Sequence, residues 1–445
     1  MNIRLIAVDL DGTLLENDHL TVSPRSSAAL TAAEKKGVFV ALASGRTRAV
    51  LQPVAGQLPA ARYAIASNGA SILDLKTGET IWSCPFDAPL VEKLLSVLGC
   101  HPGVSVEVYA DGLSWMAEKD RPKLDRMAQA GGFWAMFRPQ VHLVPSLADA
   151  LRGRAVEKFT ISGMGPGEKE EILRELCAQD LLAVSSSVPG YMELNAKGVN
   201  KGEGLAHLCE TLNIPLVETM AIGDGDNDYE LMEQAGVSVA MCSGLEEVKR
   251  RAAYETPLSN EEGGVGAAVE QFVLTPDLLP EDEIPLALAM TDYERGCAER
   301  IHHLVKVTGY AALIARGEGF SPRLERVTCA AALVHDIGIR PALEQYGSSA
   351  GPYQEKEGPA PARRLLSRLG YGADAIERIA FLVGHHHTLS AVDGPDFQAL
   401  VEADALVNIG ENGLGSEAVE TARQRVFRTQ TGLALLQDLY GQPCV

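Results

Sequence analysis

Two clusters of carboxylates stand directly after short apolar segments of the chain. Asp9 and Asp11 follow residues 3–8, which are apolar except for Arg4, and the run Gly-Asp-Gly-Asp-Asn-Asp at 223–228 follows the apolar residues 220–222. Because residues two apart in an extended segment point to the same side, Asp9 and Asp11 are expected to face one site. Open α/β sheets bind their ligands at the carboxyl ends of the strands. Oxygen ligands from two strand ends suit Mg²⁺, which leaves positions for water and phosphate.

Acids after strands also serve as solvated turn residues or helix caps, and an isolated Asp-x-Asp favours that interpretation. The spacing of Asp224, Asp226 and Asp228 resembles a calcium-binding loop. Tyr229 stands where such a loop needs glycine, and Ala235 stands where it needs glutamate, which excludes the calcium loop.

Four short motifs follow one another along the chain: Asp-x-Asp-Gly-Thr at 9–13, Ser-Gly-Arg at 44–46, Lys201 in Gly-Val-Asn-Lys-Gly, and the acidic run at 223–228. Together they resemble the haloacid dehalogenase (HAD) phosphatase superfamily. Asn68-Gly69-Ala70 and a long insertion between the second and third motifs narrow the resemblance to the Cof-type branch. The resemblance covers about residues 1–272 and implies a Rossmann-like core that carries an inserted α+β cap.

The resemblance assigns catalytic roles to four residues. Asp9 is the nucleophile that forms an aspartyl-phosphate, and Asp11 protonates the leaving oxygen and then activates water. Ser44 hydrogen-bonds a phosphoryl oxygen, and Lys201 supplies positive charge where negative charge builds. A surface lysine after a glycine turn is the other interpretation of Lys201.

The resemblance also implies a metal site and substrate contacts. Mg²⁺ is held by Asp9, the backbone carbonyl of Asp11 and Asp224, and Asn227 and Asp228 complete or orient its shell. Arg46 and Asn68, with Asn227, are expected to face the substrate.

The second half of the chain carries different chemistry, since six of the ten histidines lie between 302 and 387. A single histidine on a helix is more often a packing or surface residue. His335-Asp336, at the end of an apolar helix expected at 327–334, is harder to explain in that way. Two adjacent ionisable groups there need a partner, and a metal ion provides one.

The order His, His-Asp, His, Asp on successive expected helices resembles the HD-domain superfamily of metal-dependent phosphohydrolases, over about residues 290–445. His303-Leu-Val-Lys306-Val307 fits the superfamily's opening motif, which selects His303 over His302. The implied ligands are His303, His335, Asp336, His385, His386 and Asp404. Mixed imidazole and carboxylate ligands suit Mn²⁺, Fe, Co²⁺, Ni²⁺ or Zn²⁺ better than Mg²⁺. Gln354 stands where two-metal members usually carry a further histidine. The sequence therefore allows either one metal ion or two at this site.

The elements that position these residues divide the chain into three structured parts. Strand–helix–strand alternation with apolar strands predicts a parallel sheet covered on both faces at 1–83 and 190–274. Residues 84–189 form the predicted cap, whose large aromatics, Trp115, Phe133, Trp134 and Phe137, are expected to form its own core in preference to the substrate mouth. A proline-rich linker is predicted at 275–286, and an all-helical domain at 287–445.

Composition limits the partners. The 445 residues carry 39 basic and 59 acidic side chains, a net charge of −20, which disfavours nucleic acid polymers and anionic membranes. The sequence shows no apolar run of membrane-spanning length and no signal peptide, and its eight cysteines form no Cys-x-x-Cys pair. We therefore expect a cytoplasmic protein acting on a small phosphorylated metabolite.

The two halves predict a bifunctional phosphohydrolase. The HAD half is expected to dephosphorylate a sugar phosphate or nucleotide, and the HD half to hydrolyse a second phosphate ester, such as a nucleotide. Two alternatives remain for the HD half: a ligand- or metal-sensing module that regulates the phosphatase, or a di-iron oxygenase.

Overall fold

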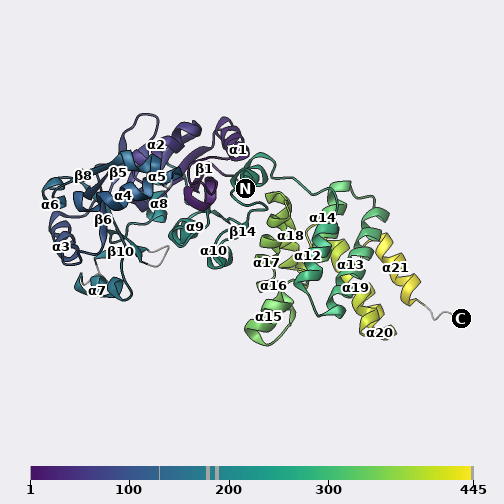
Figure 1. Ribbon diagram of the computed structural model, residues 1–445. Helices are drawn as coiled ribbons and strands as arrows, with labels where there is room; N and C mark the ends of the chain where they lie inside the picture. Colours follow the sequence, from purple (N-terminus) through teal and green to yellow (C-terminus); the bar gives the residue numbers. More distant parts are fainter. Residues whose placement is uncertain (1, 130, 177–180, 186–189, 442–445) are drawn as a thin grey trace. The chain divides into compact units, whose positions relative to one another are not determined.

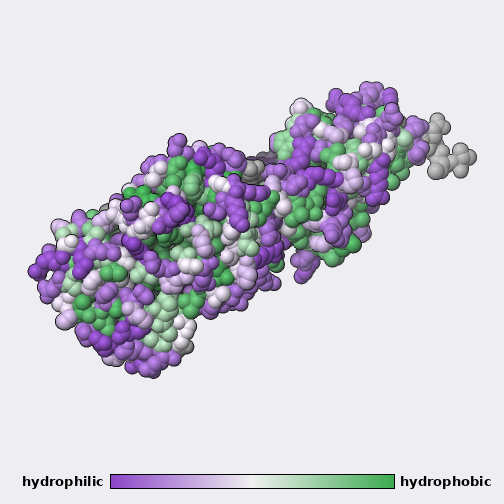
Figure 2. Space-filling view, turned by 90° about the horizontal axis from the view of Figure 1, so that it is seen from above, coloured by the Kyte–Doolittle hydropathy of each residue, from purple (hydrophilic) through white to green (hydrophobic). Residues whose placement is uncertain are grey.

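The computed structural model describes residues 2–129, 131–176, 181–185 and 190–441 in two compact units, Met1–Leu274 and Thr275–Val445 (Figure 1). The N-terminal unit contains two β-sheets and the C-terminal unit is helical. Across the described ranges, no helix is both long enough and apolar enough to cross a membrane. On the face drawn in Figure 2, hydrophilic residues surround scattered hydrophobic ones.

The first sheet has eight strands in the order β14-β13-β12-β1-β2-β3-β4-β5. The six strands from β14 to β3 are parallel, and β4 and β5 are antiparallel additions at one edge. The strands are β1 (Leu5–Asp9), β2 (Phe39–Ala43), β3 (Ala61–Ala66), β4 (Ser71–Asp74), β5 (Thr80–Ser83), β12 (Thr219–Gly223), β13 (Val237–Ala240) and β14 (Tyr254–Glu255). This Rossmann-like arrangement confirms the predicted α/β core, although the sheet is not parallel throughout.

Local sequence explains the core elements. Every residue of β1 and β12 is buried, which is the pattern of central strands covered on both faces. Ser23 caps the next helix by accepting a hydrogen bond from the backbone of Ser26, and Pro24 occupies the first helical position, as predicted. The core helices are α1 (Pro24–Lys35), α2 (Arg48–Gln57), α8 (Lys201–Leu212), α9 (Tyr229–Gln234), α10 (Glu246–Arg251) and α11 (Gly264–Val269).

A second, six-stranded sheet forms the cap, in the order β10-β11-β9-β6-β7-β8. Its strands are β6 (Ser105–Ala110), β7 (Leu113–Ala117), β8 (Val141–Val144), β9 (Val156–Ser162), β10 (Leu182–Ser185) and β11 (Tyr191–Ala196). Its helices are α3 (Ala88–Gly99), α4 (Arg121–Gln129), α5 (Gly132–Phe137), α6 (Leu147–Ala150) and α7 (Glu168–Glu175). The cap thus lies between β5 and α8 in the chain.

The end of the cap differs from the prediction. Residue 189, the predicted boundary, lies outside the described residues. β11 follows it and pairs with β9 and β10 of the cap sheet. Residues 191–196 therefore belong to the cap and not to the core, because alternating burial in β11 serves the cap's own apolar layer.

The two faces of the cap sheet differ in chemistry. Val106, Val108, Phe159, Ile161 and Met192 point into the cap's hydrophobic core together with residues of α3 and α7. The intervening residues are polar: Ser105, Glu107 and Tyr109 on β6, Lys158, Thr160 and Ser162 on β9, and Tyr191 and Glu193 on β11. Because side chains alternate along a strand, one face is packed and the other presents polar groups.

The C-terminal unit is all helical, as predicted. Its helices are α12 (Ile284–Tyr293), α13 (Ala298–Gly317), α14 (Pro322–Val334), α15 (Ile339–Tyr346), α16 (Gly351–Glu357), α17 (Pro359–Arg368), α18 (Ala373–Val383), α19 (Pro395–Glu411), α20 (Ser416–Arg425) and α21 (Gln430–Tyr440). α13 packs against α14 and α19, and α14 also packs against α18 and α19. These four helices are the ones predicted to carry the histidine and aspartate ligands.

Glu402 of α19 offers a test of how this unit is held together. Its carboxylate is fully buried and accepts hydrogen bonds from the backbone N–H groups of Arg428 and Thr429 and from the Thr429 hydroxyl. Removing the acceptor leaves these part-buried donors without their partner. We expect Glu402→Ala to lower the free energy of unfolding of the C-terminal unit by about 3 kcal/mol, measured by denaturant unfolding of the full chain. Exposed Glu417→Ala is the control and should change it by less than about 0.5 kcal/mol; equal effects would contradict the structural role of Glu402.

Candidate active sites

The first site lies where β1 and β12 end side by side. Asp9 is the last residue of β1, and Asp224 and Asp228 follow β12, which pairs in parallel with β1. One carboxylate oxygen from each of these three residues lies within 4.8 Å of the others. The parallel register therefore brings together the two acidic clusters that the sequence separates by more than two hundred residues.

Lys201 lies between two of these carboxylates. Its Nζ donates to Oδ1 of Asp9 at 2.6 Å and to Oδ1 of Asp228 at 2.7 Å, and its side chain is fully buried. Burial lowers the pKa of Lys201, but Asp228 and Asp9 raise it further, so the net shift is upward. Lys201 is thus a buried ammonium and not a surface lysine after a glycine turn.

The carboxylates are crowded beyond what one ammonium offsets. Burial, with the neighbouring Asp228, raises the pKa of Asp9 well above its ordinary value. Burial also raises the pKa of Asp224 to about 6, and Asp228 adds to the shift. Three carboxylates in reach of one another, with raised pKa values, form a donor set that fits a hard divalent cation such as Mg²⁺.

Glycines and capping hydrogen bonds hold these acids in place. The hydroxyl of Thr13 donates to Oδ1 of Asp224 at 2.7 Å. Oδ2 of Asp228 accepts from the backbone N–H groups of Asp224 and Gly225 at 3.0 and 3.1 Å. Gly12 has a φ of +87°, and a Cβ there would collide with the carboxylate of Asp224, so only glycine allows this close approach.

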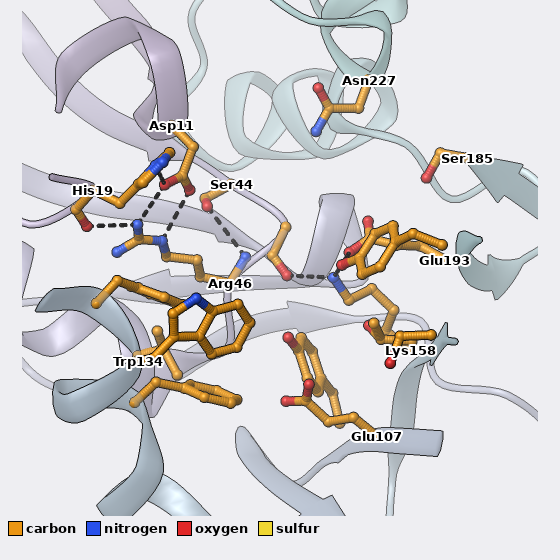
Figure 3. Close-up of a pocket in the computed structure, with 18 of the residues that line it drawn as sticks. Asp11, His19, Ser44, Arg46, Glu107, Trp134, Lys158, Ser185, Glu193 and Asn227 are labelled. Atoms are coloured by element: carbon orange, nitrogen blue, oxygen red, sulfur yellow. Dashed lines mark hydrogen bonds and ion pairs between the residues drawn. The ribbon is translucent and has the colours of Figure 1, made fainter. Parts of the chain in front are cut away.

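Asp11 has a different environment from the one its predicted role suggests. Its carboxylate forms a two-point ion pair with Arg46, at 2.9 Å from Nε and 2.5 Å from Nη2, and lies 2.9 Å from Nδ1 of His19 (Figure 3). Burial raises the pKa of Asp11, but the hydrogen bonds from His19 and Arg46 outweigh it and lower the pKa below its ordinary value. The Asp11 side chain is therefore outside the three-carboxylate group, and His19 is a site residue that the motifs did not indicate.

Ser44 and Gly45 follow β2 and lie at the wall of the same cavity. Oγ of Ser44 accepts a hydrogen bond from the backbone of Arg46 at 3.1 Å. A Cβ on Gly45 would lie 2.9 Å from Oδ1 of Asn68 and 3.3 Å from Nζ of Lys158, so the position needs a small residue. Ser44 and Arg46 thus both line the cavity.

Asn68 does not face the cavity, contrary to the prediction. Its Nδ2 donates to Oε2 of Glu193 at 2.6 Å and to Oδ1 of Asn195 at 3.3 Å, both on β11 of the cap. Lys158 makes a similar connection, since its Nζ donates to the backbone carbonyl of Gly45 at 2.7 Å and to Glu193 at 2.6 Å. Asn68 therefore holds the cap to the core, and the cap strands supply polar groups to the site.

A cavity of about 900 Å³ opens in front of these residues. Asp9, Asp11, Ser44, Arg46, Asp224 and Asn227 line its core side. Phe133, Trp134 and Phe137 of α5 line its cap side, which corrects the expectation that they serve only the cap core. Trp115 does pack in the cap core. The sequence analysis did not predict the cap residues Glu107 and Lys158 as site residues. The alternation of apolar and polar residues along β6 and β9 could have indicated them, since the polar positions of those strands face the cavity.

The second site lies in the C-terminal unit. His303 and Asp404 lie on α13 and α19, His335 and Asp336 follow α14, and His386 follows α18. Their ligand atoms form two groups that share His335: His303, His335 and Asp404, and His335, Asp336 and His386, each within 4.8 Å. His302 is exposed and belongs to neither group, whereas His303 is buried and belongs to the first, which agrees with the choice of His303.

The histidine rings are oriented by their second nitrogen. Nδ1 of His335 and Nδ1 of His386 each lie 2.9 Å from a backbone carbonyl, of Ala332 and Val383 respectively. Nδ1 of His303 lies 2.9 Å from Oε2 of Glu411. An N–H at each of these positions leaves the Nε2 lone pairs turned toward the carboxylates, the arrangement that metal-ligating histidines show.

The spacing at this cluster suits a shared cation. Nε2 of His303 lies 3.3 Å from Nε2 of His335 and 3.2 Å from Oδ1 of Asp404. Burial lowers the pKa of His335, but Asp336 and Asp404 outweigh it and raise the pKa to about 9. The pKa of Asp336 falls to about 2 despite burial, because His335 and His386 lie beside it. The imidazole and carboxylate atoms that lie together here are donors that fit a transition metal.

His385 is not brought into either group. Its Nδ1 lies 2.8 Å from the carbonyl oxygen of Phe381, and its ring stacks on the Phe381 ring at 4.3 Å between centroids. It is therefore the one predicted C-terminal ligand that the described structure leaves outside the cluster. Gln354, at the position of the missing histidine, is buried and donates to the carbonyl of Ser349.

With this geometry established, the family of the N-terminal unit is clear. The chain belongs to the haloacid dehalogenase-like hydrolase family, whose sequence model matches residues 6–269. It is a phosphatase, and its class acts on small phosphate esters. Enzymes of this superfamily use Mg²⁺, which agrees with the three-carboxylate group.

Three comparisons support this assignment. The 5-amino-6-(5-phospho-D-ribitylamino)uracil phosphatase of Bacillus subtilis is 31% identical over 274 residues, which cover 62% of this chain and 97% of that protein. The HMP-PP phosphatase of Serratia proteamaculans is 29% identical over 252 residues, which cover 55% of this chain and 86% of that protein. The structure of a haloacid dehalogenase-like hydrolase from B. subtilis superposes with a TM-score of 0.54 at 26% identity, and covers 60% of this chain and 99% of its own.

The buried ammonium of Lys201 makes a prediction about stability. Lys201→Met removes the partner of two buried carboxylates, so we expect the free energy of unfolding of the N-terminal unit to fall by about 3 kcal/mol. Added Mg²⁺ should recover part of this loss, because a cation that binds the folded state alone stabilises it.

Thermal melting of the full chain with and without Mg²⁺ measures both effects. Lys197→Met, at an exposed position four residues earlier, is the matched control and should melt like the wild type. If the two variants melt alike, Lys201 does not balance the charge of the site.

Proposed function

We propose that the N-terminal unit cleaves a phosphomonoester through an aspartyl-phosphate on Asp9. The observation that carries this proposal is the position of Asp9: it ends the central strand β1, borders the cavity, and is held 2.6 Å from the Lys201 ammonium. An Oδ atom of Asp9 attacks phosphorus, the bond from phosphorus to the ester oxygen breaks, and water later cleaves the acyl-phosphate to release inorganic phosphate. Lys201 stabilises the negative charge that builds on the phosphoryl group.

Asp11 serves as the acid and base of this sequence. It gives a proton to the departing ester oxygen and then takes one from the attacking water. In the ligand-free site, Arg46 and His19 hold Asp11 as the anion. We propose that the phosphate of the substrate draws the Arg46 guanidinium away from Asp11, since a phosphate dianion is the stronger two-point partner for a guanidinium. Without this partner the pKa of Asp11 rises, and the carboxylate takes up from solvent the proton that it then gives to the ester oxygen.

The metal site consists of Asp9, Asp224 and Asp228, with the backbone carbonyl of Asp11 as a further ligand and Asn227 beside them. A divalent cation there supplies Lewis-acid polarisation and charge neutralisation. Ser44 orients a phosphoryl oxygen by hydrogen bonding. The relative from B. subtilis is named for a phosphorylated ribitylaminouracil, which supports a sugar phosphate or a nucleotide-like ester as the substrate of this chain.

We propose that the C-terminal unit is a second metal-dependent phosphohydrolase of the HD type, which makes the chain bifunctional. The observation that carries this proposal is the convergence of His303, His335, Asp336, His386 and Asp404 from four helices. Mn²⁺, Fe, Co²⁺, Ni²⁺ or Zn²⁺ suits their mixed nitrogen and oxygen donors, and two overlapping groups of ligand atoms allow one or two ions.

A regulatory role is the second candidate for this unit. Gln354 in place of a histidine removes one donor that two-metal members usually carry, which favours metal or ligand sensing over turnover. A di-iron oxygenase is the third, and oxygen-dependent turnover distinguishes it from both.

Asp9→Asn separates the two proposed activities. The amide keeps the shape of the side chain and removes the nucleophile, so phosphate release in Mg²⁺ should fall by at least about a thousandfold. The measurement is phosphate release by the full chain from an activated aryl phosphate and from a sugar phosphate. Some activity can remain in Asp9→Asn and require Mn²⁺. We assign this activity to the C-terminal unit if it disappears when His335→Ala and Asp336→Ala are added to the same chain. Near-normal Mg²⁺-dependent turnover by Asp9→Asn would contradict the nucleophile.

The C-terminal cluster is tested by its metal content. The full chain should purify with a transition metal. Chelation should lower the melting temperature of its C-terminal unit, because metal at a thousandfold excess over Kd stabilises the folded state by about 4 kcal/mol. His335→Ala with Asp336→Ala should abolish both effects. His302→Ala is the matched control and should retain them, because neighbouring residues on a helix point about 100° apart. A chain that neither contains a transition metal nor melts higher when Mn²⁺ or Zn²⁺ is added would exclude this site.

A further inference from the structure

The cavity in front of Asp9 has two chemically different walls in the cap. One wall is aromatic and consists of Phe133, Trp134 and Phe137 of α5. The other is the polar face of the cap sheet, where Glu107, Lys158 and Glu193 lie (Figure 3). A ligand whose phosphate lies at Asp9 and Ser44 therefore places its leaving group between an apolar and a polar surface.

The aromatic wall is built around one exposed ring. Phe133 and Phe137 stack with centroids 5.6 Å apart, and the Arg46 guanidinium lies 4.7 Å from the centroid of Phe133 on the core side. Trp134 packs against both phenylalanines, at 5.3 and 5.8 Å between centroids, yet its residue remains 38% exposed. The cluster thus fixes the indole at the edge of the cavity, where a flat ligand ring finds an aromatic surface.

Among the described residues of the polar wall, Glu107 forms no ion pair as close as the one between Glu193 and Lys158, although Lys158 and the Tyr109 side chain also act on it. Glu193 is paired with Lys158 at 2.6 Å and also accepts from Asn68 and Tyr191. Glu107 lies across the sheet from it, since both pair with Thr160 of β9 in register. The hydroxyl of Ser114 donates to Glu107, and burial raises the pKa of Glu107 to about 7. A ligand with O–H or N–H donors satisfies the rest of this carboxyl group.

The size of the cavity agrees with a leaving group larger than a short sugar. Sites for drug-sized ligands span roughly 300–1,000 Å³, and this cavity of about 900 Å³ lies near the upper end of that range. A four- or five-carbon sugar phosphate is small for a cavity of this volume.

We propose, building on the phosphatase activity assigned to this site, that it selects phosphomonoesters whose leaving group joins a planar heterocyclic ring, stacked on Trp134, to hydroxyl or N–H donors that reach Glu107. Trp134 and Glu107 are the specificity-determining residues, and ring-free sugar phosphates are poor substrates.

Matched pairs of esters that differ only in the ring test this selection. Uridine 5′-monophosphate is compared with ribose 5-phosphate, and flavin mononucleotide with ribitol 5-phosphate, by kcat/KM for phosphate release from the full chain in Mg²⁺. Stacking of a ring on an aromatic side chain is worth about 1–3 kcal/mol, so the ring-bearing member of at least one pair should be preferred by about fivefold or more.

Three variants identify the residues responsible. Trp134→Ala should bring the preferred pair's ratio of kcat/KM close to one, and Trp134→Phe should restore much of it. Glu107→Gln should lower kcat/KM for the ring-bearing ester about fivefold or more. Phe39→Ala should leave both kcat/KM for this ester and the ratio of kcat/KM within the pair at the wild-type values. Phe39 is the matched control, since it is an aromatic residue of similar exposure, 37%, that does not line the cavity.

A binding measurement keeps this selection distinct from the chemistry of Asp9. Calorimetric titration of the Asp9→Asn variant with the same four esters should show tighter binding of the ring-bearing members, and Trp134→Ala in that background should remove the difference. Equal or weaker binding of the ring-bearing esters, or a preference that Trp134→Ala leaves intact, overturns the proposed selection even if Asp9 is the nucleophile. Full turnover by Asp9→Asn would contradict the assignment of Asp9 as the nucleophile. The ring preference would then be judged from the calorimetric titration alone.

Discussion

Burial of negative charge at the ends of two adjacent parallel strands is the constraint on which the N-terminal unit depends. Asp9 and Asp228 are almost completely removed from water, and Asp224 lies within ligand distance of both. An isolated buried carboxylate is costly, so these groups persist only with partners. Lys201 is one partner, backbone N–H groups are others, and the charge that remains makes the site receptive to a divalent cation. The same partners that stabilise the buried carboxylates thus hold them in the positions that a divalent cation requires.

The C-terminal cluster solves a similar problem with histidine. Its carboxylates, Asp336 and Asp404, face Nε2 atoms whose rings are held by hydrogen bonds at Nδ1. The lone pairs of the Nε2 atoms and the carboxylate oxygen atoms repel one another, and a proton or a metal ion between these atoms removes the repulsion. The two sites therefore differ in the softness of their donors, which is the physical reason to expect different metals in the two units of one chain.

The parts that could be predicted from the sequence are those that depend on local pattern. Buried strands such as β1 and β12, the cap of α1 at Ser23, and the apolar helices around His335-Asp336 all have short-range signals, and the structure contains them. The position of both acidic clusters after strands predicted the grouping of Asp9 with Asp224 at the carboxyl edge of a sheet, and the family resemblance then assigned a role to each residue. The antiparallel strands β4 and β5 and the assignment of β11 to the cap were missed because strand pairing is decided by distant partners.

The residues whose surroundings the sequence did not indicate share one property: the direction of each side chain is set by a contact across the cavity or the helical cluster. Asn68 turns to the cap because Glu193 accepts its amide hydrogen, and Arg46 turns to Asp11 because two-point pairing with a carboxylate is favourable. His385 stacks on Phe381 while its neighbour His386 joins the metal-ligand group. Arg46 has a further significance, since it contacts the acid of the core through its guanidinium edge and Phe133 of the cap through its face. In the proposed mechanism, a phosphate that engages Arg46 changes the surroundings of Asp11 and of the aromatic wall together, so that recognition of the leaving group and release of the proposed acid depend on the same side chain.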